Sequence, residues 1–416
     1  MAPRTIVGID VGTTKVCTVV AQILDNGRIN VLGVGLTPSK GLDRGVVVNI
    51  EDAVNAISTS VEKAERLSGY RIGTAFVGVS GRHVSSLNSR GVVAVSRTDH
   101  EITRHDVARA VEAAQAVAIP TQREIIHIIP RAYIVDGTEG IRDPIGMSGF
   151  RLEVETHIIT GEVMAIQNLI KSVQKAGVEI DDLVLQPLAS GEAVLSDDDK
   201  DRGVVLVDIG GGTTDIAVFA QGGIWHTSVI PVGGSHFTND IVLVLQTPHN
   251  TAEYLKLKYG AAIATPPENE ADDIVEVEGF APGERQSISR YLLNQILQAR
   301  AEEVAELIYS EIRRSGYEGL LPAGIVLTGG SSQLPGIDEL MRDMLGIPVR
   351  VGSPGEMSGL SDSLSSPPYA TCLGLVRWGA RHGAAQINTP SGNAGERGGW
   401  NSTYERFKGW LREFLP

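Results

Sequence analysis

Residues Gly8–Ala21 have the sequence GIDVGTTKVCTVVA, and residues Leu206–Ala220 have the sequence LVDIGGGTTDIAVFA. Each stretch has an aspartate between apolar residues, then glycine, two threonines and a second apolar run. We call them the first and the second hairpin, because short apolar runs on both sides of a glycine turn indicate two paired strands. Two such copies about 200 residues apart indicate a duplicated domain with a cleft between the halves.

The glycines of both hairpins indicate a site for phosphate groups. Gly12 and Gly210–Gly212 have no Cβ, so their backbone can approach a phosphate and direct N–H groups at it. The side chains expected around the phosphates are those of Thr13, Thr14, Lys15, Thr213, Thr214 and Asp215. The threonines would donate hydrogen bonds, and Lys15 would neutralise phosphate charge. A GxxxxGK[ST] loop is absent, so we expect two hairpins to grip the phosphates instead of one loop.

The two repeated aspartates indicate a magnesium site. Asp10 and Asp208 end strands that we expect to be buried, and carboxylates hold Mg²⁺ in proteins, here through its waters. The alternative is that both segments are only glycine turns. That alternative explains one copy more easily than two, because the aspartate stands at the same place in each.

Two further segments fit the nucleoside part of a nucleotide. Thr328–Ile337 has the sequence TGGSSQLPGI, in which Gly329 and Gly330 would let an adenine lie flat against the backbone. Ser331 and Gln333 of this segment are assigned to the same site. Ala252–Lys256 has the sequence AEYLK, which places Glu253 and Lys256 on one helical face, where they could hold a ribose or the adenine edge. The alternative for that pair is an ordinary surface ion pair. The expected ligands are therefore ATP and Mg²⁺.

Composition and charge exclude other classes of protein. The 416 residues carry a net charge of −14, which repels nucleic-acid phosphates, so we expect no nucleic-acid partner. The only two cysteines, Cys17 and Cys372, lie in apolar segments and predict inert buried thiols in a reducing cytoplasm. We expect no signal peptide, and no apolar run reaches the ~18 residues that span a bilayer.

The segment Trp400–Pro416, WNSTYERFKGWLREFLP, has the pattern of an amphipathic helix that lies on a membrane. Its apolar stripe consists of Trp400, Tyr404, Phe407, Leu411, Phe414 and Leu415, with Trp410 beside it. Lys408 and Arg412 can reach lipid headgroups from the edges of the stripe. The alternative is a helix that docks on its own domain or on a partner. Residues 383–399 form a Gly-, Asn-, Ala- and Ser-rich linker, which argues against docking on the same chain.

The strand and helix pattern predicts the order of the domains. Val46–Ile50 is predicted as a strand and Asp52–Ser68 as a helix, and Thr103–Ala118 is predicted as a helix capped by Thr103 and Asp106. The predicted domains are a first half at 1–81 and 162–200, an inserted α+β module at 82–161, a second half at 201–382, a linker at 383–399 and a membrane-targeting helix at 400–416. The second half includes a smaller subdomain at about 236–300, and the chain returns to the first half at about 365–382.

The set DVGTTK, DIGGGTTD and TGGSSQLPGI, in this order, resembles the superfamily of actin, sugar kinases and heat-shock chaperones. Within it, residues 4–382 are similar to the FtsA family of bacterial cell-division proteins, and the C-terminal segment matches separately. The more specific stretches are DPIGMSGFRLEVETHIIT at Asp143–Thr160 and LVLQPLASGEAVL at Leu183–Leu195. The resemblance implies an actin-like, ribonuclease H-like duplicated fold with the nucleotide in the interdomain cleft and an inserted α+β module.

The same resemblance implies a function at the division septum. It implies an ATP-binding filament former that associates with itself, with membrane lipids and with other division proteins. It would tether FtsZ to the inner face of the cytoplasmic membrane through the C-terminal helix. The FtsZ C-terminal tail would bind the smaller subdomain, where Arg300 matches a contact position, although a solvated helix arginine explains that residue equally well.

The resemblance also implies how the site treats ATP. Gln186 would lie near the metal and the attacking water. Chaperone relatives have glutamate at the position of Gln186 and an adenine-stacking arginine at the position of Gln333, so we expect weak ATP hydrolysis or none.

Three other functions remain as alternatives. A sugar or acetate-type kinase of the same fold needs a carboxylate base over its substrate, and the sequence offers no convincing candidate. A chaperone ATPase needs a peptide-binding domain that is missing here. A pilus-assembly type of actin-like scaffold is disfavoured by the DPIGMSGFRLE module and by the C-terminal helix.

Overall fold

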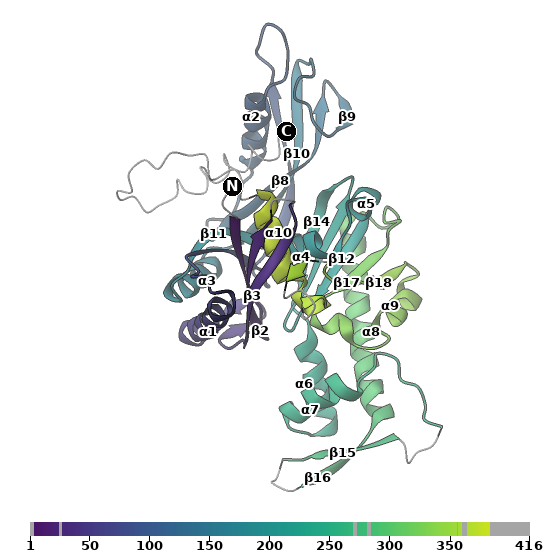
Figure 1. The fold of residues 1–416 in the computed structure, drawn as a ribbon. Coiled ribbons are helices and arrows are strands. Elements are labelled where there is room, and N and C mark those ends of the chain that lie inside the picture. Colours follow the sequence, from purple (N-terminus) through teal and green to yellow (C-terminus); the bar gives the residue numbers. More distant parts are fainter. Residues whose placement is uncertain are drawn as a thin grey trace.

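The computed structural model describes residues 4–24, 27–268, 273–280, 284–355, 357–359 and 364–382. Two sheets stand side by side, with a separate sheet at one end of the molecule and a mainly helical part at the other (Figure 1). The predicted linker at 383–399 and the predicted amphipathic helix at 400–416 lie outside the described residues.

Five strands of the first central sheet have the same topology as the second central sheet. The first contains β1 (Arg4–Val11), β2 (Lys15–Ile23), β3 (Ile29–Pro38), β6 (Thr74–Val79), β11 (Glu179–Leu185) and β19 (Ser358–Gly359). The second contains β12 (Val204–Ile209), β13 (Thr214–Ala220), β14 (Gly223–Ile230), β17 (Ile325–Thr328) and β18 (Val349–Val351). The orders β3-β2-β1-β6-β11 and β14-β13-β12-β17-β18 correspond strand by strand, with two antiparallel pairs followed by two parallel pairs. The predicted duplication is therefore confirmed.

Two helices fill the space between the sheets. They are α4 (Gln186–Val194) and α10 (Ala370–His382), and both bury apolar side chains in a cluster that also contains residues of β1, β2, β12 and β13. The two helices cross closely, because a Cβ on Gly374 would overlap the backbone carbonyl oxygen of Ala189. The chain leaves the first sheet through α4 and returns to it through α10. It therefore crosses between the halves along these two buried helices.

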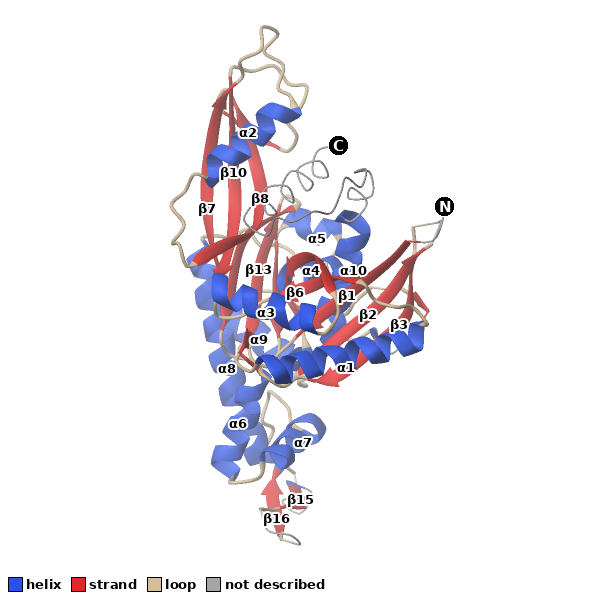
Figure 2. Ribbon diagram, turned by 90° about the vertical axis from the view of Figure 1, so that its left-hand side faces the viewer, coloured by secondary structure: helices blue, strands red, loops and turns tan. Residues whose placement is uncertain are grey.

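The outer face of the first sheet is covered by α1 (Ile50–Ser68) and α3 (Val163–Lys175), as Figure 2 shows. The strand predicted at Val46–Ile50 is shorter in the structure. Only Val46–Val47 form a strand, β5, which pairs with β4 (Leu42–Asp43). Asn49 is extended and accepts hydrogen bonds from the first backbone N–H groups of α1, so its side chain starts the helix at Ile50.

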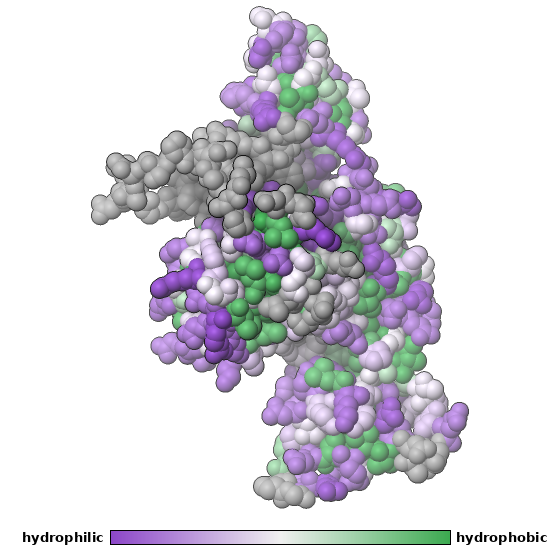
Figure 3. All heavy atoms as spheres, in the orientation of Figure 1, coloured by the Kyte–Doolittle hydropathy of each residue, from purple (hydrophilic) through white to green (hydrophobic). Residues whose placement is uncertain are grey.

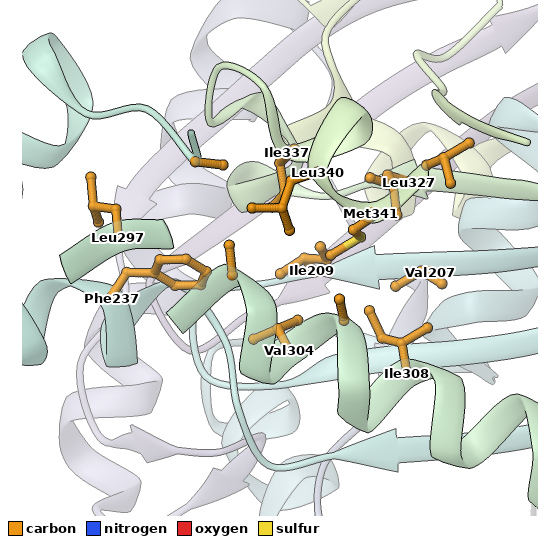
Figure 4. Packing of buried hydrophobic residues seen from close by; sticks show 14 of the residues in the cluster. Val207, Ile209, Phe237, Leu297, Val304, Ile308, Leu327, Ile337, Leu340 and Met341 are labelled. Atoms are coloured by element: carbon orange, nitrogen blue, oxygen red, sulfur yellow. The ribbon is translucent and has the colours of Figure 1, made fainter. Parts of the chain in front are cut away.

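The outer face of the second sheet is covered by α8 (Arg290–Ser315) and α9 (Ile337–Leu345). Val207 and Ile209 of β12 point to this face and meet Val304 and Ile308 of α8 (Figure 4). Phe237 lies at the end of the same cluster. It comes from α6 (Gly234–Leu245), so this core also fixes the helix that begins beside the second hairpin.

The inserted segment forms its own layer of sheet and helix. The sheet has the order β7-β10-β8-β9, with β7 (Ser85–Ala94), β8 (Arg123–Val135), β9 (Thr138–Ile141) and β10 (Arg151–Glu162). The helix α2 (Arg104–Gln115) lies on β7 and β10. The predicted cap is confirmed, because Thr103 and Asp106 exchange hydrogen bonds in a capping box, but the helix ends at Gln115 instead of Ala118.

The part of the molecule opposite the module consists of α6, α7 (His249–Tyr259) and the hairpin of β15 (Ile274–Glu278) and β16 (Arg285–Ser289). The minor helices are α5 (Asp197–Arg202) and the 3-10 turns η2 (Gly330–Gln333) and η4 (Pro367–Tyr369). In the described chain, no helix combines the length and the apolarity that crossing a bilayer requires. In the view of Figure 3 the described surface is mainly hydrophilic, with apolar residues in separate patches.

Candidate nucleotide site

The two hairpins have the same turn at the same distance from their aspartates. The backbone N–H of Gly12 donates to the carbonyl oxygen of Lys15 at 3.0 Å, and that of Gly210 donates to Thr213 at 2.9 Å. In the strand registers Asp10 lies opposite Cys17, and Asp208 lies opposite Asp215. The turn is thus a property of the repeated sequence, and it presents both glycine backbones at one end of the two sheets.

The turns of the two hairpins meet. A Cβ on Gly212 would lie 2.8 Å from both Oγ1 and Cγ2 of Thr13, and one on Gly211 would overlap the side chain of Thr14. These close approaches require glycine at both positions. The structure therefore brings together the phosphate-binding segments that the sequence predicts 200 residues apart, and it shows them in contact with each other.

Three carboxyl groups are buried beneath the turns. Burial raises the pKa of Asp10 to about 7, and the negative charge of Asp208 adds to the shift while Lys15 opposes it. Burial also raises the pKa of Asp215 to about 7, with repulsion from Asp208 and Asp10 adding to it. The pKa of Asp208 is raised by burial as well, although two hydroxyl donors oppose the shift. A positive charge near these groups would lower all three pKa values.

Each of these carboxyl groups is held by a neighbour from another element. Gln186, the first residue of α4, donates from Nε2 to Oδ1 of Asp10 at 3.1 Å. Ser190 and Thr371 donate to Oδ2 of Asp208 at 2.6 and 3.2 Å.

Asp215 is held across the halves. The hydroxyl of Ser80, which follows β6 in the first half, donates to Asp215 Oδ1. Sequence reasoning missed the roles of Ser80, Ser190 and Thr371. Only Ser190 lay in a segment that had been singled out, LVLQPLASGEAVL.

The segment after β17 lies against the same carboxylates. Gly329 has a φ of 82°, and a Cβ there would overlap Asp208 Oδ1, so only glycine lets this loop pass so close to the carboxylate. Ser331 donates from Oγ to the carbonyl oxygen of Gly210 at 3.2 Å. Gly330 and Gln333 are exposed. This segment therefore contacts the second hairpin at Gly210 and lies beside Asp208.

Glu253 and Lys256 of α7 belong to a network that is more than a surface ion pair. Lys256 Nζ contacts Oε2 of Glu253 at 2.8 Å, Oγ1 of Thr238 at 2.8 Å and the carbonyl oxygen of Gly234 at 3.1 Å. Gly234 begins α6, and its N–H donates to the carbonyl oxygen of Gly210 at 2.9 Å. The network thus ties α7 to the second hairpin through the first residue of α6.

Some predicted side chains point elsewhere in this structure. The Lys15 ammonium group donates to the carbonyl oxygen of Pro368 and lies 4.0 Å from the centroid of the Tyr369 ring, so it faces η4. Thr214 is buried between two strands and donates from Oγ1 to the carbonyl oxygen of Val232 at 2.8 Å, so its hydroxyl faces away from the predicted phosphates.

Two other threonine hydroxyls have partners near the predicted site. Thr213 donates to Asp215 at 3.1 Å, and Thr13 accepts from the N–H of Gly45 at 3.3 Å.

Arg300 lies in the helical part opposite the module. Its guanidinium group pairs with both oxygens of Asp240, with Nε–Oδ2 at 2.6 Å and Nη2–Oδ1 at 2.8 Å, and with Glu303 at 2.5 Å. The side chain therefore has a structural role within the chain, because it joins α8 to α6. The predicted membrane residues, from Trp400 to Leu415, lie outside the described residues.

Comparisons with known protein families find two matching profiles. A family profile described as "Cell division protein FtsA" matches residues 205–374, and one described as "SHS2 domain inserted in FTSA" matches residues 81–160. The cell division protein FtsA of Pseudomonas aeruginosa is 45% identical over 90% of this chain and 89% of its own. Those of Neisseria meningitidis and Bacillus subtilis are 42% and 41% identical over 97% and 91% of this chain, and over 97% and 84% of their own.

Solved structures show the same fold at low identity. The PilM–PilN type IV pilus biogenesis complex matches with a TM-score of 0.65 at 17% identity, over 90% of this chain and 98% of its own. MreB5 of Spiroplasma citri bound to ADP matches with a TM-score of 0.54 at 15% identity, over 89% and 94%. Both have the actin-like ATPase fold, so the predicted actin-like α/β fold with an inserted module is confirmed.

Proposed function

The chain belongs to the FtsA family of bacterial cell-division proteins, and we propose that it acts there as an ATP-binding scaffold that tethers FtsZ to the membrane. The observation that carries the nucleotide part is the pair of hairpins. Asp10 and Asp208 occupy equal positions in two identical turns that touch each other, and each carboxyl group is buried.

Magnesium fits this arrangement better than a metal held by protein alone. In the described chain no three His, Cys, Asp or Glu side chains are placed to hold a metal by themselves. Mg²⁺ commonly keeps several waters and binds one or two carboxylates together with substrate phosphates. Asp10 and Asp208 would supply those carboxylates through water. The raised pKa values of Asp10 and Asp208 are relieved by the same cation.

The rest of the site divides between phosphates and nucleoside. The backbone N–H groups of Gly211 and Gly212, with the hydroxyls of Thr13, Thr14 and Thr213, would hold the phosphates, while Gly12 and Gly210 form the turns that place them. Lys15 would reach the phosphates by leaving Pro368. The adenine would lie along Gly329, Gly330, Ser331 and Gln333, and Glu253 and Lys256 would hold the ribose or the adenine edge.

Gln186 sets the chemistry that we propose for bound ATP. It contacts Asp10 and would position water near the metal, but a side-chain amide takes up no proton at neutral pH. Without a general base at this position, ATP acts mainly as a conformational ligand and its hydrolysis is weak or absent.

The scaffold part of the proposal involves the far end of the second half and the C-terminal segment. The FtsZ tail would bind the smaller subdomain near Arg300, whose pairing with Asp240 and Glu303 fixes the surface that the tail meets. Trp400–Pro416 would bind the cytoplasmic side of the cell membrane at the septum. One short helix gains little after the entropy cost of ordering, so the helices of several copies in a filament would bind together by avidity.

Two experiments test the proposal. The wild type should bind ATP in a Mg²⁺-dependent way in calorimetry, and Asp10→Asn or Asp208→Asn should lose at least about tenfold in affinity, since each removes one charged hydrogen-bonded contact. Asp198→Asn is the matched control, because that carboxylate is exposed on α5. Equal affinities for wild type and both site variants would exclude the nucleotide site.

The second experiment tests the membrane anchor. Deletion of Trp400–Pro416 should release the protein from sedimenting liposomes while ATP binding persists. A shortened chain that still sediments with liposomes would show that the anchor lies elsewhere.

A further inference from the structure

The inserted module contacts both halves of the molecule, although the chain connects it only to the first. It leaves the first half after β6 and rejoins it at α3. Arg123 links the two connecting segments, because its guanidinium group donates to the carbonyl oxygens of His83 at 2.8 Å and Thr160 at 3.0 Å. The N–H of Leu185, at the end of β11, donates to His127 of β8 at 3.0 Å. Two chain connections and the Leu185–His127 hydrogen bond thus tie the module to the first half.

Its second contact is to β14, the edge strand of the other sheet (Figure 1). His157 Nε2 of β10 lies 2.9 Å from Oγ1 of Thr227, and Ser86 of β7 donates to the carbonyl oxygen of Thr227 at 2.9 Å. Thr227 and His157 are both buried. An edge strand that would otherwise expose its backbone is thus covered by the module.

An arginine joins the same two bodies. The guanidinium carbon of Arg131, on β8, lies 4.2 Å from the ring centroid of Trp225, and the Arg131 Nη2 donates to the hydroxyl of Tyr317 at 2.6 Å. The rings of Trp225 and Tyr317 meet edge to face at 5.3 Å. We call the set of Ser86, Arg131, His157, Trp225, Thr227 and Tyr317 the latch interface.

The latch interface is polar and incompletely satisfied. Among the described residues, Arg131 Nε and Trp225 Nε1 are buried without a hydrogen-bond partner, and so is Nε2 of the neighbouring His226. A buried polar group without a partner lowers the stability of a contact, and polar contacts between domains of one chain tend to open. Such an interface suits a contact that forms and breaks in the folded protein.

We propose that the inserted module is a latch across the nucleotide cleft, closed when the latch interface is formed. Any rotation that separates the two hairpins also moves the module relative to β14, because the module travels with the first half. Opening the cleft therefore requires the latch interface to break or to slide. This inference rests on the proposed nucleotide site, and it makes the module a regulator of nucleotide release.

The test measures release of a fluorescent ATP analogue from the full-length protein after a chase with unlabelled ATP. Arg131→Ala should speed release by about tenfold, equivalent to ~1.4 kcal/mol of lost latch stability. Arg151→Ala is the matched control, since Arg151 lies in the same sheet but pairs with Glu153 inside the module, and its release rate should match the wild type. Unchanged release from Arg131→Ala would overturn the latch.

A cross-link tests the opposite direction. Arg142 and Asp201 face each other across the same two bodies at 3.2 Å, with side chains 70% and 48% exposed. The double variant Arg142→Cys with Asp201→Cys can be bridged by a short bis-maleimide, because the native Cys17 and Cys372 are buried. The bridged protein should release the analogue several-fold more slowly than either single variant treated in the same way.

Equal or faster release from the bridged protein would contradict the latch. Binding of the analogue with unaltered release in both tests removes the latch alone. No binding of the analogue by the wild type removes the proposed nucleotide site, and the latch with it.

Discussion

Gln186 donates a hydrogen bond from Nε2 to Oδ1 of Asp10 at 3.1 Å, so the first residue of α4 holds a carboxyl group near the end of β1. This contact links the buried helix between the two sheets to the proposed metal site. A change in the charge or ligation of Asp10 therefore alters a hydrogen bond of α4, the helix on which the two halves pack.

Asp10 predicts a pH dependence of stability in the metal-free protein, and we expect bound magnesium to reverse its direction. Its pKa is raised by burial from 3.8 to about 7 in the folded protein, so the folded state retains a proton that the unfolded state releases. In the metal-free protein this group therefore destabilises the fold as pH rises from 3.8 to about 7, by up to ~1.4 kcal/mol per pH unit. Asp10→Asn should become progressively more stable than the wild type over that interval in urea unfolding.

Wild type and Asp10→Asn must be compared at each pH, because the buried histidines change stability with pH in the opposite direction to Asp10. Burial lowers the pKa of His83 and His127 to about 4 and that of His157 to about 3, so they stabilise the fold as pH rises toward 6.5. Both proteins contain these histidines, so their contribution cancels in the difference between the two free energies of unfolding. With Mg²⁺ and ATP the wild type should become the more stable protein, and an unchanged order of stability would count against metal binding at Asp10.

Gly374 is predicted to be essential for the packing of α10 on α4. A Cβ in Gly374→Ala would overlap the carbonyl oxygen of Ala189, so the helices must separate or shift. Such overpacking costs about 1–3 kcal/mol of unfolding free energy, and more where backbone blocks the way. Gly73→Ala is the control, since no atom lies within 4 Å of its Cβ position. Equal denaturation midpoints for the two variants would show that the helices are not closely packed there.

The contact between the hairpins can be tested by a double-mutant cycle. Gly211→Ala should weaken ATP binding, because its Cβ would overlap the side chain of Thr14 and force the turns apart. Thr14→Ala should restore part of the lost affinity by removing the overlapped atoms. Strict additivity of the two changes in binding free energy would mean that the turns do not meet in the ATP-bound protein.

Glu253 is expected to recognise the ribose. Thr238 and Lys256 both donate to Oε2 of Glu253, and the side chain is 39% exposed. Its other carboxylate oxygen can therefore accept from a ribose hydroxyl. The wild type should then bind ATP more tightly than 2′-deoxy-ATP, by about 1–3 kcal/mol if the contact is charge-assisted, and Glu253→Ala should bind both equally. Discrimination that persists in Glu253→Ala would assign the ribose contact to another residue.

The sequence was sufficient for the duplicated core because the repeated motifs are local. Asp10 and Asp208 each stand within a single hairpin whose turn is made by glycine and threonine residues next to it in the sequence, so both turns could be predicted without knowing their partners. The parts that escaped prediction come from distant elements. Ser80, Ser190 and Thr371 reach the carboxylates from the end of β6, from α4 and from α10, and only the fold brings them together.

Strand β3 was missed for a related reason. Gly33 and Gly35 interrupt its apolar pattern, and this weakens the strand signal in the sequence. In the fold these glycines allow α1 to lie directly on the sheet, because a Cβ on Gly35 would overlap the carbonyl oxygen of Ser60. The residues that obscure the strand are therefore the ones that permit its packing. The sequence predicts Lys15 at the phosphates, but in the structure Lys15 contacts η4. This contact could not be predicted locally, because η4 lies more than 350 residues away in the sequence.

The most direct test of the account is a crystal structure with Mn²⁺ in place of Mg²⁺ and a non-hydrolysable ATP analogue, in which the metal is located by its anomalous signal. The account predicts one metal peak between the carboxylates of Asp10 and Asp208, with the analogue's phosphates against the glycines of both hairpins. A bound analogue whose metal lies away from either carboxylate, or whose phosphates contact only one hairpin, would contradict it.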